Sequence, residues 1–367
     1  MASLSQNIYC LLYYLFVCFI GYNWTINSHY KYRDQNRVGL LVFILFSILT
    51  LTYFADSDYF HYKVRLNEFS NNISGGIEII YVWIGEIVSY NYILFRAVIW
   101  ISALLIFCFI AKILRISINH SLYFLFVVFI GLFAYARASL GMCVLVCGLV
   151  LYLREKKVLN KLIGLVIFIS SCFFHNSLII AILIGIVSIF LRLNKKNITF
   201  LLVLSVLMSV IITEVFVYLL SNPLSDAYLM TKLSYYTSES YSGSSDVTLL
   251  GKVRGLLEIG IFVLPVYYMT KSLLKYEKSS VSCLRSEIVL NNLCIIIVLL
   301  SMAIQSLPLG TNVFAYRIRY MALIPISIVM VSLTDRGMIK FKSFKICLLL
   351  GFLYEVTGLI SNLKHSL

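Results

Sequence analysis

Two carboxylates, an imidazole and three phenols lie in the run from Tyr53 to Tyr62, at the end of one apolar segment and directly after it. Asp56 and Asp58 could act as general bases or hold a cation, and His61 and Tyr62 could line a sugar-stacking surface beside them. The same residues also suit a solvated loop with aromatic side chains at a membrane interface. The residue types leave both interpretations open.

A single arginine, Arg137, separates two apolar runs of only about sixteen residues each, short for a membrane crossing of about 20 residues. Its guanidinium would then lie below the interface, where an arginine costs roughly 2.5–3.5 kcal/mol on insertion scales. We therefore expect a partner, most naturally a phosphate, which a planar guanidinium binds in a bidentate manner. The alternative is an arginine that reaches lipid headgroups at a hairpin turn.

His175 and Asn176 also stand between two strongly apolar runs. A histidine at this place can act as a general base near neutral pH, or bind an anion when it is charged. We assign Asn176 to the same substrate-binding group. The alternative is a turn in which Asn176 or Ser177 caps the next helix.

A third cluster is the run Tyr316-Arg317-Ile318-Arg319-Tyr320. On a helix Arg317 and Arg319 point about 200° apart, since each residue turns about 100°, so one can face a cavity while the other faces a helix or the headgroups. Tyr320 shares a face with Tyr316 and could stack a sugar ring beside a phosphate. Further upstream, Arg254 and Glu258 are spaced i, i+4, which predicts a structural pair.

The composition restricts which class of protein can position these side chains. Of the 367 residues 61% are hydrophobic and 13% charged, and the mean hydropathy is +0.93, whereas soluble domains have about 45–50% apolar residues. This excludes an ordinary soluble enzyme. The nine cysteines are interpreted as small apolar fillers. No nucleotide motif or metal-ligand spacing is visible, so we expect no cofactor, no metal site and no nucleic-acid partner.

The fold predicted from the apolar runs is all-α, a polytopic integral membrane protein with about 12 transmembrane helices (11–13). Residues 77–90 are too short for a crossing and carry two glutamates, so an interfacial or re-entrant helix is predicted there. We treat residues 1–367 as a single transmembrane domain with extracytoplasmic loops near 55–91 and 221–250, and the first run as a retained span. The predicted spans are 8–22, 38–54, 92–111, 121–136, 138–153, 160–174, 177–191, 198–220, 253–270, 287–306, 313–333 and 344–362.

The distribution of lysine and arginine predicts the orientation. Most of the 30 basic residues fall in alternate loops, for example 154–161 and 336–345, and the positive-inside rule places those loops in the cytoplasm. Both termini and all the motifs above are then extracytoplasmic. The formal charge of +14 is thus interpreted as a topology signal.

Taken in order, these motifs resemble the EpsG family of bacterial polysaccharide polymerases, which are close in function to Wzy-type O-antigen polymerases. The likeness covers roughly residues 40–335 and rests on Asp58-x-x-x-Tyr62, Arg137, Phe174-His175-Asn176-Ser177-Leu178 and the Tyr316–Tyr320 run. Family members often have a glutamine after the arginine, where this chain has Ala138.

The resemblance implies a GT-C-like multi-pass glycosyltransferase of the bacterial inner membrane, with its active face on the periplasmic side. It would join oligosaccharide repeat units carried on undecaprenyl pyrophosphate into O-antigen or a related polysaccharide, using such units as both donor and acceptor. Membrane lipid and a chain-length regulator protein would be its other partners.

The site residues then take the following roles. Arg137 and Arg317 or Arg319 would stabilise the leaving pyrophosphate, and His175 would be the first candidate for the base, followed by Asp58 and Asp56. Tyr320, Tyr62, His61 and Asn176 complete the substrate-binding group. The alternatives are a flippase for lipid-linked oligosaccharides, although no internal repeat favours it, or an O-antigen ligase. We expect segments 55–90 and 221–250 to recognise the variable part of the substrate.

Overall fold

The computed structural model describes twelve parts of the chain in detail. These are residues 3–23, 41, 44–45, 47–48, 63–64, 66–68, 79–133, 136–175, 177–191, 249–276, 285–305 and 312–366. The predicted spans 38–54 and 198–220 lie largely or wholly outside these ranges, and so does nearly all of the loop 221–250.

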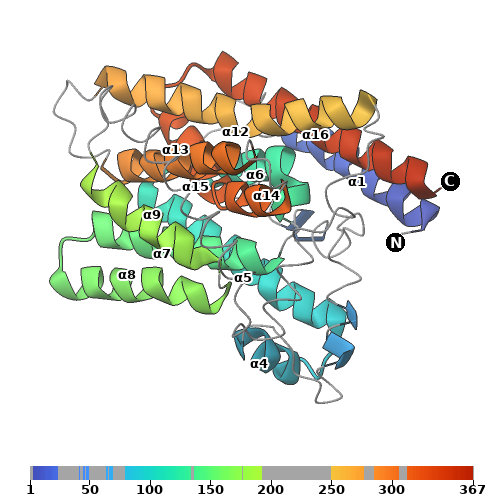
Figure 1. Cartoon of the computed structure of the whole chain (residues 1–367), viewed down its shortest axis with the longest axis horizontal. Coiled ribbons are helices and arrows are strands. Elements are labelled where there is room, and N and C mark those ends of the chain that lie inside the picture. The colour runs from blue at the N-terminus through green and yellow to red at the C-terminus, as the bar shows by residue number, and fades with distance from the viewer. Residues whose placement is uncertain are drawn as a thin grey trace, which may run out of the picture.

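Within these ranges every regular element is a helix, which confirms the predicted all-α class (Figure 1). In chain order they are α1 Leu4–Gly21, α4 Ile79–Ile87, α5 Tyr92–Leu114, α6 Ile118–Phe133, α7 Ala136–Arg154, α8 Val158–Ser170, the 3₁₀ turn η2 Ser171–Phe173, α9 Leu178–Phe190, α12 Leu249–Tyr276, α13 Arg285–Gln305, α14 Asn312–Tyr320, α15 Leu323–Asp335 and α16 Phe341–Ser366.

Five of the described helices are long and apolar enough to cross a membrane, and these are α1, α5, α12, α13 and α16. Each falls on a predicted span, so the chain is a multi-helix membrane protein. Five further apolar helices are shorter than 18 residues. The total of about twelve crossings and the GT-C-like architecture stay predictions.

The predicted run 313–333 is not one helix but two. α14 ends in a turn in which the amides of Met321 and Ala322 donate to the carbonyls of Ile318 and Arg319, each at 3.0 Å, and α15 begins at Leu323. The reason lies at Pro325, whose ring would clash with the carbonyl of Met321 in a continuous helix. In the first turn of a new helix its missing N–H costs nothing.

Residues 79–87 form the short helix α4, as predicted for an element too short to cross the membrane. Its nine residues span about 14 Å at ~1.5 Å per residue, against a hydrocarbon core of about 30 Å. A turn with Ser89 and Tyr90 at φ of 51° and 56° follows. Asn91 then caps α5 by accepting hydrogen bonds from the amides of Ile93 and Leu94.

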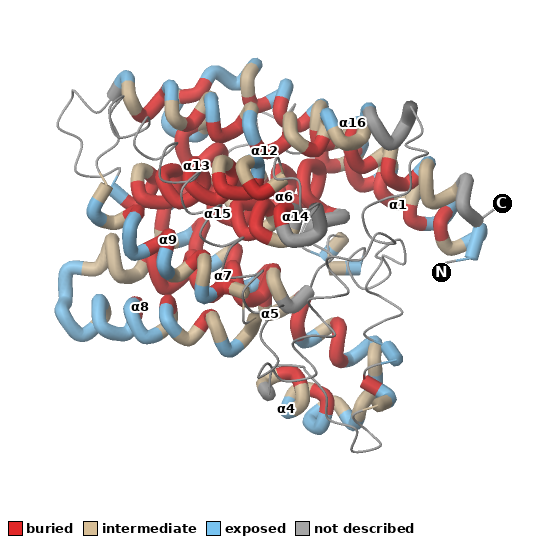
Figure 2. The backbone as a smooth tube through the Cα atoms, in the orientation of Figure 1, coloured by how far each residue is buried: buried red, intermediate tan, exposed pale blue. Residues whose placement is uncertain are grey.

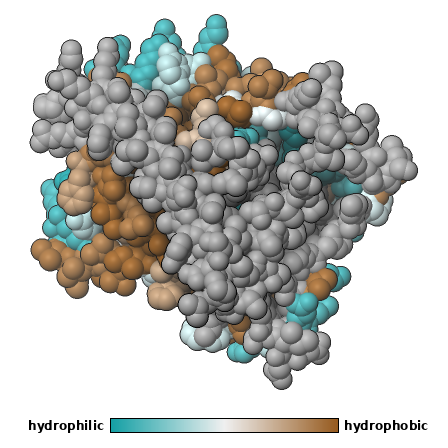
Figure 3. Space-filling model, viewed as in Figure 1, coloured by the Kyte–Doolittle hydropathy of each residue, from teal (hydrophilic) through white to brown (hydrophobic). Residues whose placement is uncertain are grey.

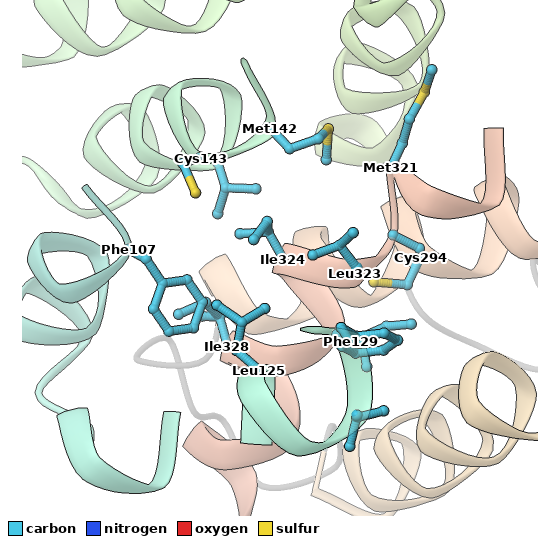
Figure 4. Close-up of a cluster of buried hydrophobic side chains, with 14 of the residues drawn as sticks. Phe107, Leu125, Phe129, Met142, Cys143, Cys294, Met321, Leu323, Ile324 and Ile328 are labelled. Carbon is cyan, nitrogen blue, oxygen red and sulfur yellow. The ribbon is translucent and has the colours of Figure 1, made fainter. Parts of the chain in front are cut away.

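The centre of the bundle is formed by α13 and α15, which are buried along most of their length (Figure 2). Around them pack α5, α6, α7, α9, α12 and α16. Figure 4 shows a cluster to which several of these helices contribute buried side chains: Phe107, Leu125, Phe129, Met142, Cys143, Cys294, Met321, Leu323, Ile324 and Ile328. The described cysteines are free, and most are buried.

The helices α7 and α8 approach each other closely at two glycines. A Cβ atom at Gly148 would lie 2.3 Å from the backbone nitrogen of Phe168, and one at Gly164 would lie 2.6 Å from that of Tyr152. Only glycine allows this backbone contact, which is typical of helix pairs in membranes.

The outer face of α8 is apolar and exposed. Val158, Leu162 and Val166 are more than half exposed and Ile169 is half exposed, and this surface is part of the apolar region at the lower left of Figure 3. Since a soluble protein rarely exposes so large an apolar face, it fits the acyl chains of a bilayer.

A buried carboxylate joins several helices at one end of the bundle, which we call the Glu287 end. Glu287 is fully buried at the start of α13 and contacts Arg154 from the end of α7 and Arg336 from the end of α15. Nearby, Asp335 accepts from the amide of Ser117 at 2.7 Å and contacts His120 at 2.8 Å.

Basic side chains predicted to share one side of the membrane gather at this same end. It holds Lys112, Arg115, Arg154, Lys156, Lys157, Lys271, Lys275, Arg285, Arg336, Lys340, Lys342 and Lys345 near helix boundaries. The termini lie at the opposite end, where Asn7 donates to the carbonyl of Asn362 at 3.4 Å (Figure 1). Which end faces the cytoplasm stays a prediction.

Candidate functional site

The two arginines of α14 occupy different environments, as their angular spacing predicts. Arg319 is 1% exposed and points into the bundle, whereas Arg317 is half-buried. Both lie in the last turn of α14, where positive charge is favoured by the helix dipole. Arg319 therefore faces protein, and Arg317 keeps surface that a ligand can reach.

Three polar side chains surround the guanidinium of Arg319. Its Nε donates to Ser301 Oγ at 3.2 Å, and its Nη1 lies 3.5 Å from Glu258 Oε1. Its Nη2 donates to Gln305 Oε1. Because Glu258 lies on α12 and the other two on α13, this arginine ties three helices together. We call this end of the bundle the Arg319 end.

The start of α7, with Arg137, lies at the Arg319 end. Arg154 at the other end of α7 contacts Glu287 at the start of α13. Arg137 precedes Arg154 by about 25 Å at ~1.5 Å per residue, and α7 packs against α13. The position of Arg137 is thus level with the end of α13, near Gln305. Arg137 opens a helix, as predicted; the structure describes its backbone only.

His175 lies at the same end of the bundle as the start of α7. Asn292, near the start of α13, donates to the carbonyl of Leu191 at the end of α9 at 3.1 Å, and the two helices pack together. The start of α9 then lies about 20 Å away at ~1.5 Å per residue, at the Arg319 end. His175 stands just before it and is half-buried.

A close contact brings the turn of His175 onto α7. A Cβ atom at Gly141 would lie 2.4 Å from Leu178 Cδ1 and 3.2 Å from Phe174 Cβ. Gly141 is one helical turn after Arg137, so the turn around His175 packs directly beside the start of α7. The alternative in which Ser177 caps α9 is not realised, because its side chain makes no cap hydrogen bond; Asn176, the other candidate cap, lies outside the described residues.

Other predicted site residues are only partly accounted for. Tyr320 is half-buried in the last turn of α14, close to Arg319, whereas the side chain of Tyr316 is not described. Five predicted residues lie outside the described ranges: Asp56, Asp58, His61, Tyr62 and Asn176. Their roles stay predictions.

Arg254 interacts electrostatically with Glu258, as their i, i+4 spacing predicts, but each of them also has a partner on another helix. The ion pair of Glu258 is formed with Arg319, and the guanidinium of Arg254 lies over the ring of Tyr354 on α16, 5.3 Å from its centroid. The buried Glu355 is next to Tyr354 and also interacts electrostatically with Arg254. The Arg319 end is therefore rich in charged side chains despite its burial.

A comparison with protein-family models adds the decisive observation. The model of the EpsG family matches residues 38–364, which is most of the chain. The chain belongs to the EpsG family. No curated protein and no solved structure gives a significant match. Membership of the EpsG family agrees with the resemblance inferred from the motifs and indicates a membrane polysaccharide-polymerase type of function.

In this EpsG-family protein the Arg319 end can bind an anion beside the half-buried His175. Arg317 is half-buried at this end, the backbone of Arg137 lies at the start of α7 there, and His175 lies on the same side. Arginines suit a leaving pyrophosphate, because they stabilise developing negative charge without a proton transfer. Among the described residues, no group of three or more His, Cys, Asp and Glu side chains is placed to hold a metal.

The sequence did not predict Ser301 and Gln305 as partners of Arg319, nor Arg319 as the ion-pair partner of Glu258. For Glu258 the sequence does hold a signal, because it is a carboxylate inside an apolar run, and an ionisable residue within a span marks a candidate functional site. For Ser301 and Gln305 the sequence holds no comparable signal, because uncharged polar residues are common in buried helices.

Proposed function

We propose that this EpsG-family protein polymerises polyprenyl-pyrophosphate-linked oligosaccharide repeat units into a surface polysaccharide. Undecaprenyl pyrophosphate is the expected carrier, and both donor and acceptor carry it. The Arg319 end is the active end and faces the extracytoplasmic side of the bacterial inner membrane.

One observation carries the proposal. In a bundle that is apolar over most of its interior, the motif residues Arg317, Arg319, Tyr320 and His175 and the start of α7 all lie at one end, opposite to the end where the basic loop residues gather. Anion-binding arginines are needed where the lipid pyrophosphate meets the membrane interface, and the positive-inside rule places that end outside the cytoplasm.

The reaction assigns distinct tasks to these residues. Arg317 and Arg137 bind the pyrophosphate of the donor and stabilise the charge that develops as it leaves. Arg319 is held by Glu258, Ser301 and Gln305, so it positions α14 rather than serving as the main pyrophosphate ligand. Tyr320 stacks a sugar ring, and His175 supplies a hydrogen bond or a positive charge to the anion.

The experiment is the electrophoretic length distribution of the surface polysaccharide in cells that lack this gene. The cells are complemented with the wild-type chain, with Arg317→Ala or with His175→Ala, each checked for insertion. We expect the deletion and Arg317→Ala to lose the long-chain ladder while single repeat units still reach the lipid core.

Two other outcomes would contradict the proposal. Loss of the single-unit species as well, with repeat units retained at the cytoplasmic face, would indicate a flippase. Full-length polymer that accumulates on its lipid carrier without transfer would indicate a ligase.

A further inference from the structure

Two buried glutamates in this chain are bound in very different ways. Glu287 has 0% side-chain exposure, and both of its oxygens accept hydrogen bonds, with distances of 2.7–3.2 Å from Arg154, Arg336, Ser286 and Ser332. Burial would leave the oxygens of such a carboxylate unsatisfied, but here both have hydrogen-bond partners. Glu287 therefore has a structural role.

Glu258 has a much weaker arrangement. Its one described ion pair joins Oε1 to Arg319 at 3.5 Å, which is long for a charge-assisted hydrogen bond, and its side chain keeps 9% of its surface accessible. It lies within a helix apolar enough to cross a membrane. An ionisable group held so loosely at such a place is costly for the fold, and that cost is expected where the group has a function.

The neighbours of Glu258 suit a group that exchanges a proton. Arg319 is fixed independently by Ser301 and Gln305, so its charge stays beside the carboxylate whether or not a proton is bound. The other charged or titratable groups around it are Arg254 on the same helix and Tyr354 and Glu355 on α16. The side chains that α13 contributes near Glu258 are Ser301 and Gln305, and both are neutral. The charged residues at the end of α15, Asp335 and Arg336, lie at the Glu287 end.

We propose that Glu258 is a catalytic residue, the base that accepts the proton of the attacking sugar hydroxyl, in place of His175. The assignment rests on the proposed polymerase function. The hydroxyl oxygen of the acceptor forms a bond to the anomeric carbon of the donor, and its proton passes to the Glu258 carboxylate. The bond from the anomeric carbon to the pyrophosphate oxygen breaks, and its electron pair leaves with the pyrophosphate. The neutral Glu258 then releases its proton to water.

The test uses the purified full-length protein in proteoliposomes. The substrate is the lipid-linked repeat unit extracted from cells that lack this gene, in which unpolymerised units accumulate. Initial rates of chain elongation are measured over a range of pH and substrate concentration for wild type, Glu258→Gln and Glu258→Ala. Glu355→Gln is the matched control, because it removes a second buried carboxylate from the same end.

We expect Glu258→Gln to fold and to lose 10²–10⁴-fold in kcat with KM changed less than threefold, the usual contribution of a general base. The rate of Glu258→Gln should no longer fall at acid pH. The rate of Glu355→Gln should still fall at acid pH and should stay within threefold of the wild-type rate. Added formate should restore at least a tenth of the lost rate to Glu258→Ala, since a small carboxylate can occupy the vacated space.

Several results would overturn the assignment. One is a folded Glu258→Gln variant with the wild-type kcat. Another is a Glu258→Gln variant whose rate is low but still falls at acid pH, together with a Glu258→Ala variant that formate does not rescue; this combination indicates a positioning role. If Glu258→Gln does not fold, Glu258→Asp replaces it: a carboxylate moved by about 1 Å should cost on the order of 10²-fold, and an unchanged rate contradicts a base. A wild-type protein that makes no polymer from this substrate overturns the proposed function itself.

Discussion

The guanidinium of Arg154, at the end of α7, donates to both oxygens of Glu287 at 3.0 and 3.2 Å, although α7 and α13 are far apart in the sequence. Arg336 approaches the same carboxylate at 2.8 Å from the end of α15. One buried acid thus fixes three helices at the end of the bundle opposite to the candidate site. The relation defines which helix ends lie together and therefore which residues can form a site.

Removing this acid should destabilise the bundle. Glu287→Ala leaves two arginines beside a vacated buried position, which typically costs about 3–5 kcal/mol when one partner of a buried pair is lost. Thermal unfolding of the protein in detergent should show a clear drop in Tm, while Glu86→Gln on the exposed face of α4 leaves it unchanged. Equal melting temperatures for Glu287→Ala and wild type would show that the network contributes little.

The two arginines of α14 should respond differently to substitution. Arg317→Lys keeps the charge but loses the planar guanidinium group that binds a phosphate through two hydrogen bonds, so we expect the elongation rate to fall by at least tenfold with an unchanged Tm. Arg319→Lys should instead lower Tm, because lysine cannot reach Ser301, Glu258 and Gln305 together. Elongation rates and melting curves of both variants check this. Full activity in Arg317→Lys would argue against bidentate pyrophosphate binding.

His175 should contribute less to the rate than Glu258. His175→Gln keeps a hydrogen-bonding side chain but cannot titrate, so we expect kcat within about tenfold of wild type and a larger change in KM. Steady-state elongation by the purified variant checks this. A loss of more than about a hundredfold in kcat that also removes a limb of the pH profile would return the role of base to His175.

The contact between α7 and α8 should not tolerate a methyl group. Gly148→Ala places a Cβ atom 2.3 Å from the backbone of Phe168, and overpacking of this kind typically costs about 1–3 kcal/mol. Gly255→Ala in α12 is the control, because no atom lies within 4 Å of its Cβ position. There alanine should stabilise the helix by up to about 1 kcal/mol. Melting temperatures that move in the same direction for both variants would contradict the close packing.

The orientation can be tested by labelling single introduced cysteines with a membrane-impermeant maleimide. Ser89→Cys lies in the exposed turn before α5, at the Arg319 end, and Lys156→Cys lies after α7, at the Glu287 end. We expect Ser89→Cys to react in cells whose outer membrane alone is opened, and Lys156→Cys only after the inner membrane is broken. The reverse pattern would place the Arg319 end in the cytoplasm.

The sequence by itself determined the class of the protein and the position of most helices. An excess of apolar residues in runs of about helix-spanning length can only be accommodated by helices in a bilayer, and α1, α5, α12, α13 and α16 fall on predicted spans. The alternation of basic loops predicted which helix ends would lie together. The break between α14 and α15 was not predicted, because the apolar run continues through Pro325, although a proline inside such a run is a signal for a helix break.

Only the tertiary structure decided which charged residues meet. Local spacing brings Arg254 near Glu258, but the ion pair of that carboxylate is formed with Arg319, which the packing of α12 against α13 and the short α14 place beside it. Likewise, nothing in the sequence distinguishes Glu287, bound on both oxygens, from Glu258, bound on one. The physical reason is that the energy of a buried charge depends on the number and geometry of its partners, and these come from helices that are distant in the chain.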